Sequence, residues 1–121
     1  MISFVTIFAH DIERTADIYR LLGFEFATEQ HDSGPTHLAY TSGAMVLEIY
    51  PGKDVVSPGI MIGVNVADLD HVRARVLAAG IPVWRDVEPR LRRMIVKDPE
   101  GRSIFVRETL PTTEDGHALP H

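Results

Sequence analysis

Three residues in the first half of the sequence have side chains suited to acid–base or metal chemistry: His31, His37 and Glu48. Glu48 lies within the apolar run Ala44–Tyr50, where a carboxylate would be costly to bury without a partner. A carboxylate and an imidazole can act together as general acid and base, and both groups also bind divalent metal ions. The three residues therefore suggest two kinds of chemistry: proton transfer by Glu48 and His37, or a non-standard metal site formed by all three.

Each of these residues also has a purely structural interpretation. Glu48 can reach solvent at a sheet edge or pair with Arg92 or Arg107, and His31 flanks a turn-forming segment typical of a protein surface. Because successive side chains of a strand point to opposite faces, His37 can meet Glu48 only if it, and not its neighbour, faces the same side.

Length and composition exclude several classes of protein. The chain has 121 residues, a formal net charge of −5 and no cysteine, which rules out thiolate zinc sites, iron–sulfur clusters and disulfides. An acidic balance argues against a general nucleic-acid-binding protein. No apolar run approaches the roughly 18 residues of a membrane span, and the first residues do not resemble a signal peptide. We therefore expect a cytoplasmic protein with no membrane partner.

An internal repeat organises the sequence. Phe4–Asp11 and Met61–Asp68 each run from β-branched or aromatic residues to an aspartate, at an offset of 57 residues. Gly23 and Gly80, at the same offset, follow an amphipathic helical pattern in each copy. The shared punctuation predicts two units of similar structure.

Each unit is predicted to be a strand, a helix and three further strands. Asp11 and Asp68 are candidate N-caps, and the two glycines are candidates for the left-handed residue after each helix. The expected strands are residues 3–9, 24–31, 36–41 and 44–50 in the first unit and 60–66, 82–88, 91–97 and 103–108 in the second. We predict one α+β domain over residues 1–110, with module 1 at about 3–51, a linker at 52–59, module 2 at about 60–108 and a flexible tail at 111–121.

The doubled pattern resembles the vicinal oxygen chelate superfamily of glyoxalase I, bleomycin-resistance proteins and extradiol dioxygenases. The resemblance covers about residues 3–108 and includes Asp98-Pro-Glu-Gly101 before the last strand, followed by Arg102-Ser-Ile-Phe-Val-Arg-Glu108. The segments His31–His37 and Leu47–Pro51 are also similar to those of many small members. The resemblance implies two modules whose mixed sheets curl around a shared cup, usually completed in a homodimer.

The same resemblance locates four positions that hold metal ligands in metal-dependent members. They are occupied here by Phe4, Glu48, Met61 and Phe105. A phenyl ring or a thioether does not supply the lone pairs that a hard or borderline divalent ion needs, and one carboxylate cannot hold a catalytic metal alone. We therefore expect no metal and no other cofactor, with the site of His31, His37 and Glu48 as the alternative.

The predicted ligand-binding residues are those that strand alternation places on the cup face, together with Trp84 and Arg92. Trp84 can stack on a planar ligand or pack against a helix, and Arg92 can face an anionic group or lie at a solvated strand edge. An apolar lining with a few polar points suits an organic ligand. The full set is Phe4, Thr6, Phe8, Tyr50, Met61, Asn65, Trp84, Arg92, Phe105 and Arg107.

The sequence thus favours a metal-independent homodimer that holds an organic or antibiotic-like molecule in an aromatic cup. Glu48 and His37 would fix the orientation of that molecule. A second hypothesis is a lyase, isomerase or dioxygenase-like enzyme in which Glu48 and His37 carry the reaction, with or without a metal. A third is an accessory module of a larger assembly.

Overall fold

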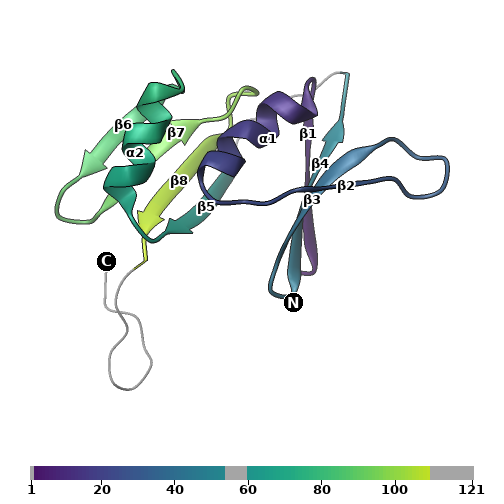
Figure 1. The fold of residues 1–121 in the computed structure, drawn as a ribbon, viewed down its shortest axis with the longest axis horizontal. Coiled ribbons are helices and arrows are strands. Elements are labelled where there is room, and N and C mark those ends of the chain that lie inside the picture. Colours follow the sequence, from purple (N-terminus) through teal and green to yellow (C-terminus); the bar gives the residue numbers. More distant parts are fainter. Residues whose placement is uncertain (1, 54–59, 110–121) are drawn as a thin grey trace.

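The chain folds into two modules, each a four-stranded mixed sheet covered on one face by a helix (Figure 1). The computed structural model describes residues 2–53 and 60–109. Most of the predicted linker and the predicted tail lie outside these residues. Among the described residues, no helix has the length and apolar character needed to cross a membrane.

Module 1 contains five elements. They are β1 (Phe4–Ala9), α1 (Ile12–Leu21), β2 (Ala27–Glu29), β3 (His37–Ser42) and β4 (Met45–Pro51). The sheet order is β1-β4-β3-β2, with β1 parallel to β4 and the other pairs antiparallel.

Module 2 repeats this arrangement. Its elements are β5 (Met61–Val66), α2 (Leu69–Ala78), β6 (Val83–Glu88), β7 (Arg93–Lys97) and β8 (Ser103–Glu108), in the sheet order β5-β8-β7-β6. The register of the paired strands repeats at the same offset of 57 residues. Phe4 pairs with Val46 in module 1, and the corresponding residues of module 2, Met61 and Ser103, also pair. The predicted α+β fold with two β-α-β-β-β modules is therefore confirmed.

Both helices begin and end where the sequence indicated. The carboxylates of Asp11 and Asp68 each accept a 3.0 Å hydrogen bond from the third backbone amide after them, which satisfies one of the free donors of the first turn. Gly23 and Gly80, with φ of 103° and 70°, supply the left-handed residue that follows each helix.

Two predicted strands are shorter than expected, for reasons outside the local pattern. Residues 24–26 do not join β2, because Phe24 and Phe26 pack against Tyr19 and Tyr40, and the ring of Phe24 stacks on that of Tyr40 at 4.3 Å. Strand β7 starts at residue 93 rather than 91, because Arg92 has a φ of 52° in the turn before it.

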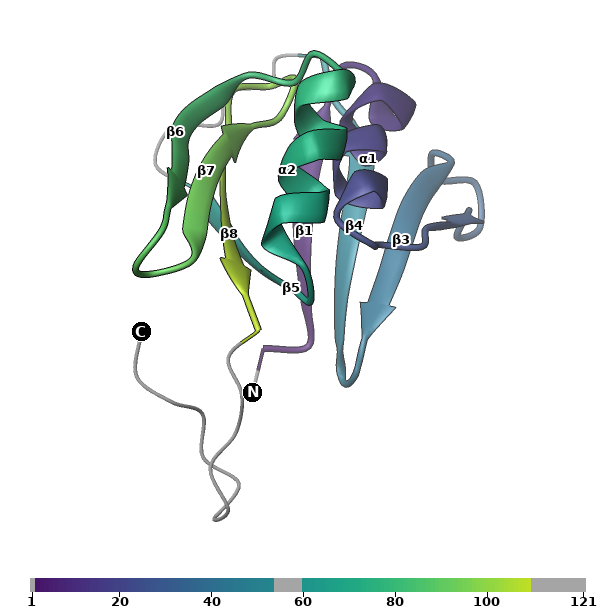
Figure 2. The same ribbon diagram turned by 60° about the vertical axis from the view of Figure 1, so that its left-hand side comes forward.

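Each sheet has one buried and one open face. The side chains under the helices form the core, with Ile7, Ile49, Ile104 and Val106 at most 3% exposed. Alternate residues point to the other face, where Phe4 is 58% exposed and Met61 53% exposed. Helices α1 and α2 lie side by side between the two sheets (Figures 1 and 2). Within one chain, the open faces therefore carry large apolar side chains in contact with solvent.

The turn that contains Asp98 connects the two modules. The Tyr19 hydroxyl of α1 donates a 3.3 Å hydrogen bond to the Asp98 carboxylate, which also forms a buried ion pair with Arg102 at 2.9 Å. The Arg102 guanidinium also donates to the backbone carbonyl of Phe8 in β1. Burial and the adjacent Asp98 carboxylate raise the pKa of the Tyr19 hydroxyl far above its usual range. The segment Asp98–Arg102, which marks the family resemblance in the sequence, therefore connects the two modules, and we call it the joint.

Candidate functional site

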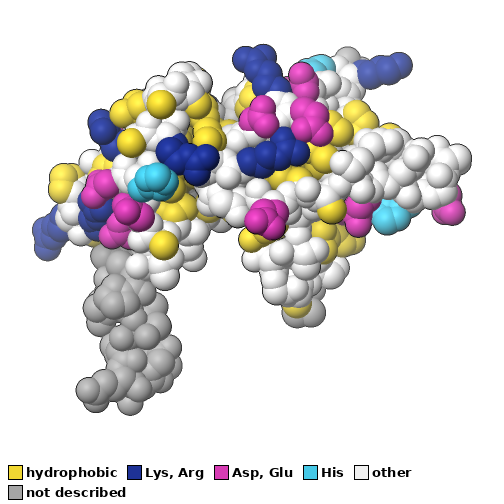
Figure 3. All heavy atoms as spheres, in the orientation of Figure 1, with side chains coloured by type: hydrophobic (Ala, Val, Ile, Leu, Met, Phe, Trp, Pro, Cys, Tyr) yellow, Lys and Arg dark blue, Asp and Glu magenta, His cyan; other side chains and the backbone are white. Residues whose placement is uncertain are grey.

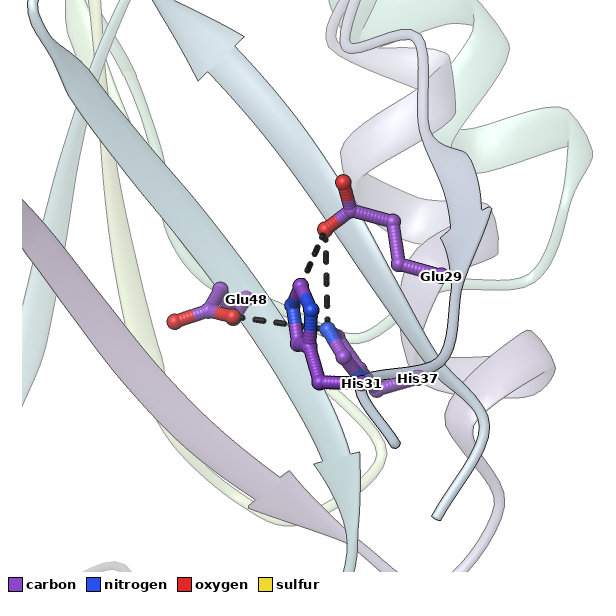
Figure 4. Close-up of side chains that lie close together, drawn as sticks. All are labelled: Glu29, His31, His37 and Glu48. Carbon is purple, nitrogen blue, oxygen red and sulfur yellow. Dashed lines mark ion pairs between the residues drawn. The ribbon is translucent and has the colours of Figure 1, made fainter. Parts of the chain in front are cut away.

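Four polar side chains converge on the open face of module 1 (Figure 4). They are Glu29 at the end of β2, His31 just beyond it, His37 at the start of β3 and Glu48 in β4. One ligand-type atom from each of them lies within 4.8 Å of the others. The antiparallel register sets Glu29 directly opposite His37, and β3 carries His37 beside the strand of Glu48.

His37 is the buried centre of this cluster, with a side chain that is 0% exposed. Its Nδ1 lies 3.2 Å from the carbonyl oxygen of Pro35, and because a carbonyl can only accept, Nδ1 carries the hydrogen of this bond. Its Nε2 lies 3.5 Å from a Glu29 oxygen and 3.4 Å from Glu48 Oε2. These separations exceed an ordinary hydrogen bond, and Nε2 has no hydrogen-bond partner among the described residues.

Glu48 is held by the strand next to it. Thr6, its register partner in β1, donates a 3.2 Å hydrogen bond from its hydroxyl to Oε1, which leaves Oε2 directed at His37. The ring of Tyr50 stacks on the imidazole of His37 at 4.0 Å. The pKa of the Tyr50 hydroxyl is raised, mainly by desolvation and to a lesser extent by the negative charges of Glu48 and Glu29. Arg92, one of the two arginines considered in the sequence as a partner of Glu48, pairs instead with Asp70 and Glu108.

The open faces hold the four residues at the metal-ligand positions implied by the resemblance. Phe4 and Met61 are exposed there, Phe105 is partly buried, and Glu48 is the one residue of the four with a donor atom for a divalent metal ion. Three of these four positions cannot coordinate a metal ion. The residues present therefore do not fit a metal at the family's positions.

A separate hollow of about 640 Å³ lies on the open face of module 2. Trp84 of β6, Ile95 of β7 and Phe105 of β8 form its apolar surface. The guanidinium of Arg93 lies 5.6 Å from the centre of the Phe105 ring, and that of Arg85 lies 5.2 Å from the Trp84 ring. Asp86 and Glu88 also line the hollow, and the Asp86 carboxylate pairs with Arg73 at 2.7 Å. The volume and the combination of aromatic rings with charged groups are typical of pockets for small organic molecules.

The structure divides the other predicted ligand-binding residues between the two open faces. Thr6, Phe8 and Tyr50 lie on that of module 1 and Asn65 and Arg107 on that of module 2, as the alternation in the paired strands requires.

Arg92 lies elsewhere, beside the first turn of α2. Its guanidinium bonds to Asp70 at 3.0 Å and Glu108 at 2.9 Å, so its charge is engaged away from the hollow. These two carboxylates raise the pKa of Arg92 beyond its usual range. The neighbouring Arg93 occupies the position at the hollow instead.

Glu29 is the member of the cluster that the sequence analysis did not single out. It is two residues before His31, so an extended chain places both on one face, and the turn after them returns the chain to His37. That spacing was a usable signal. His31 is 67% exposed, as expected for a surface turn, yet its ring centre lies 5.0 Å from that of His37.

Charges on the helix-bearing side of the molecule are mixed. Figure 3 shows acidic and basic side chains interspersed over α1 and α2, and Arg20 forms ion pairs with Glu13 and Asp17 there. This face carries no extended basic surface of the kind that binds nucleic-acid phosphates.

Comparison with known proteins identifies the family. The model of the Glyoxalase/Bleomycin resistance protein/Dioxygenase superfamily matches residues 1–105. No curated protein matches the sequence.

Similar solved structures include TnmS3, an antibiotic binding protein from Streptomyces sp. CB03234, at 20% identity and a TM-score of 0.69 over 89% of this chain and 94% of that one. A glyoxalase-related enzyme from Fulvimarina pelagi gives 19% identity and a TM-score of 0.68 over 99% and 97%. The oxidase ChaP-H2 gives 19% identity and a TM-score of 0.67 over 88% and 91%. At these identities the likeness concerns the fold.

Proposed function

The chain belongs to the Glyoxalase/Bleomycin resistance protein/Dioxygenase superfamily. We propose that the open sheet faces of this protein bind a planar organic molecule that carries an anionic group. The observation that carries this proposal is the hollow of Trp84, Ile95 and Phe105, bordered by Arg85 and Arg93. Among the described residues, neither arginine has a carboxylate within ion-pair distance. Aromatic rings would stack on the ligand and the two guanidinium groups would attract its negative charge.

The apolar part of the ligand supplies most of the affinity in this proposal. Trp84 is 57% exposed, so a planar ligand that covers its indole removes a large apolar surface from water. Binding then needs no metal ion, in line with the side chains at the four family positions. A similar structure of an antibiotic binding protein supports a drug-like ligand, at the level of the shared fold.

We further propose that a second copy of the chain closes the site. Phe4, Phe8 and Met61 are each at least 50% exposed on the open faces. Burying them against another subunit would turn two shallow faces into an enclosed cup.

The single tryptophan offers a direct test. Trp84 is the only tryptophan of the chain, so its fluorescence reports on the hollow without labelling. We expect naphthalene-2-carboxylate and related planar anions to quench it with saturation, their uncharged amides to bind more weakly, and chelator-treated protein to bind equally well.

Two variants make the test specific. Phe105→Ala and Arg93→Ala should weaken binding, while Leu77→Ala, an exposed apolar residue of α2 outside the hollow, should not. Quenching that does not saturate would contradict the proposal. So would equal affinity of Phe105→Ala, Arg93→Ala and the control Leu77→Ala for the planar anion.

General acid–base catalysis is a second candidate function. The 3.4 Å separation between His37 Nε2 and Glu48 Oε2 favours it, because a proton can pass between groups this close through a small adjustment. Glu48→Gln separates the two functions. If the variant keeps ligand binding and loses turnover of the same compound, the protein is an enzyme.

A further inference from the structure

We propose that Glu29, His31, His37 and Glu48 form a divalent metal site on module 1, separate from the four family positions. Zn²⁺ is the ion that the donor set suits best, with two imidazole nitrogens and two carboxylate oxygens. Of these four residues, only Glu48 occupies a family ligand position. The other three come from β2, the residues after it and β3.

The distances agree with shared coordination better than with hydrogen bonding. Two ligand atoms bound to one tetrahedral zinc ion at its usual bond lengths are roughly 3.3–3.6 Å apart. His37 Nε2 lies 3.5 Å from Glu29 and 3.4 Å from Glu48, and His31 Nε2 lies 4.0 Å from Glu29. The remaining separations within the set are at most 4.8 Å, and a movement of the exposed His31 side chain toward the other three ligands would bring it within coordination distance.

The hydrogen bonding of His37 gives an independent argument. Since Nδ1 donates to the Pro35 carbonyl, a neutral imidazole presents only a lone pair at Nε2. That lone pair faces two carboxylates, which are also acceptors, and Nε2 has no partner in the described part of the chain. A positive species, either a proton or a metal ion, must lie between these groups for the fully buried ring to be stable.

The surroundings favour the metal ion over the proton. A ligating histidine almost always donates the N–H of its second ring nitrogen to a carboxylate, a backbone carbonyl or water, and the Nδ1–H of His37 donates to the Pro35 carbonyl. Glu48 is oriented in the same manner by the Thr6 hydroxyl. The two carboxylate charges would balance those of one divalent ion, and the exposure of His31 and Glu29 leaves a path for the ion to enter.

The test measures metal binding directly on the full chain, after removal of metal with a chelator. Titration with Zn²⁺ by calorimetry should give one tight site per chain, and Co²⁺ should give the visible absorption of a nitrogen- and oxygen-ligated ion. Mutation of residues that only support the metal ligands weakens metal binding by roughly 10–100-fold. His31→Ala and Glu29→Gln each remove a proposed ligand, so they should weaken Zn²⁺ binding by at least that much. The His31 side chain is exposed and that of Glu29 is partly exposed, so these variants should fold normally.

His71→Ala is the matched control. His71 is an exposed histidine on α2 outside the cluster, and its loss should leave the affinity for Zn²⁺ unchanged. No Zn²⁺ binding by the wild-type chain would overturn the proposal and leave a proton between His37 and the carboxylates. Equal binding by wild type and His31→Ala would overturn it as well, because the ion would then lie elsewhere. Neither result affects the fluorescence test of the aromatic hollow, which uses chelator-treated protein.

Discussion

Replacing Arg102 with methionine should strongly destabilise the protein, because the change leaves a charge buried without its partner. The side chains of Asp98 and Arg102 are 0% and 2% exposed, and their ion pair measures 2.9 Å. Removing one member of a buried pair costs about 3–5 kcal/mol. Asp98 keeps the Tyr19 hydroxyl and the amides of Glu100 and Arg102 as donors, so we expect about 3 kcal/mol, the lower end of that range.

The assay is thermal unfolding followed by circular dichroism. For a chain of this size, the loss corresponds to a fall in the midpoint of roughly 10–15 °C. Arg73→Met is the matched control, because Arg73 also forms a close ion pair, with Asp86 at 2.7 Å, but in solvent. Its midpoint should change far less. Similar shifts in the two variants would refute the reasoning, because burial of the Asp98–Arg102 pair would then carry no special weight.

Two further predictions concern single groups. The Thr15 hydroxyl is buried and has no hydrogen-bond partner among the described residues, so Thr15→Val should raise the free energy of unfolding by about 1 kcal/mol, measured by urea denaturation. A loss of stability would show that the hydroxyl has a partner after all. The Arg92 guanidinium, then the Leu69 amide, lower the pKa of Glu108 below 4.5. Its stabilisation should therefore be complete above pH 4.5 and be lost as the pH falls through the lowered pKa. Urea midpoints of the wild type should fall more steeply over this acidic range than those of Glu108→Gln, and parallel curves would contradict the assignment.

The repeat and the ends of the helices could be predicted because they depend on local residues. An aspartate that caps a helix and a glycine that ends one act within a few positions of the chain, so Asp11, Asp68, Gly23 and Gly80 were recognisable in the sequence. The repeat added long-range information, because equal spacing in the two halves implied equal strand registers.

The candidate sites were only partly predictable, because they depend on pairing between strands. Glu29 joins the cluster through its register opposite His37, which the letters alone do not fix. Arg92 and Arg93 are adjacent in sequence, but a turn at Arg92 sends the first to the carboxylates near α2 and the second to the hollow. Trp84 could be assigned to the open face only once β6 was placed beside β7.

The joint at Asp98 makes the two halves of the repeat unequal. At an offset of 57 residues, Asp98 and Arg102 correspond to Thr41 and Met45, which cannot form an ion pair. Module 2 therefore contacts module 1 through the Phe8 carbonyl and the Tyr19 hydroxyl, and the buried ion pair that makes these contacts has no counterpart at Thr41 and Met45. A chain built from two copies of module 1 would keep the sheets but lose this attachment. The duplication is symmetrical in its strands but not in the contacts between the modules, so the two modules are not interchangeable.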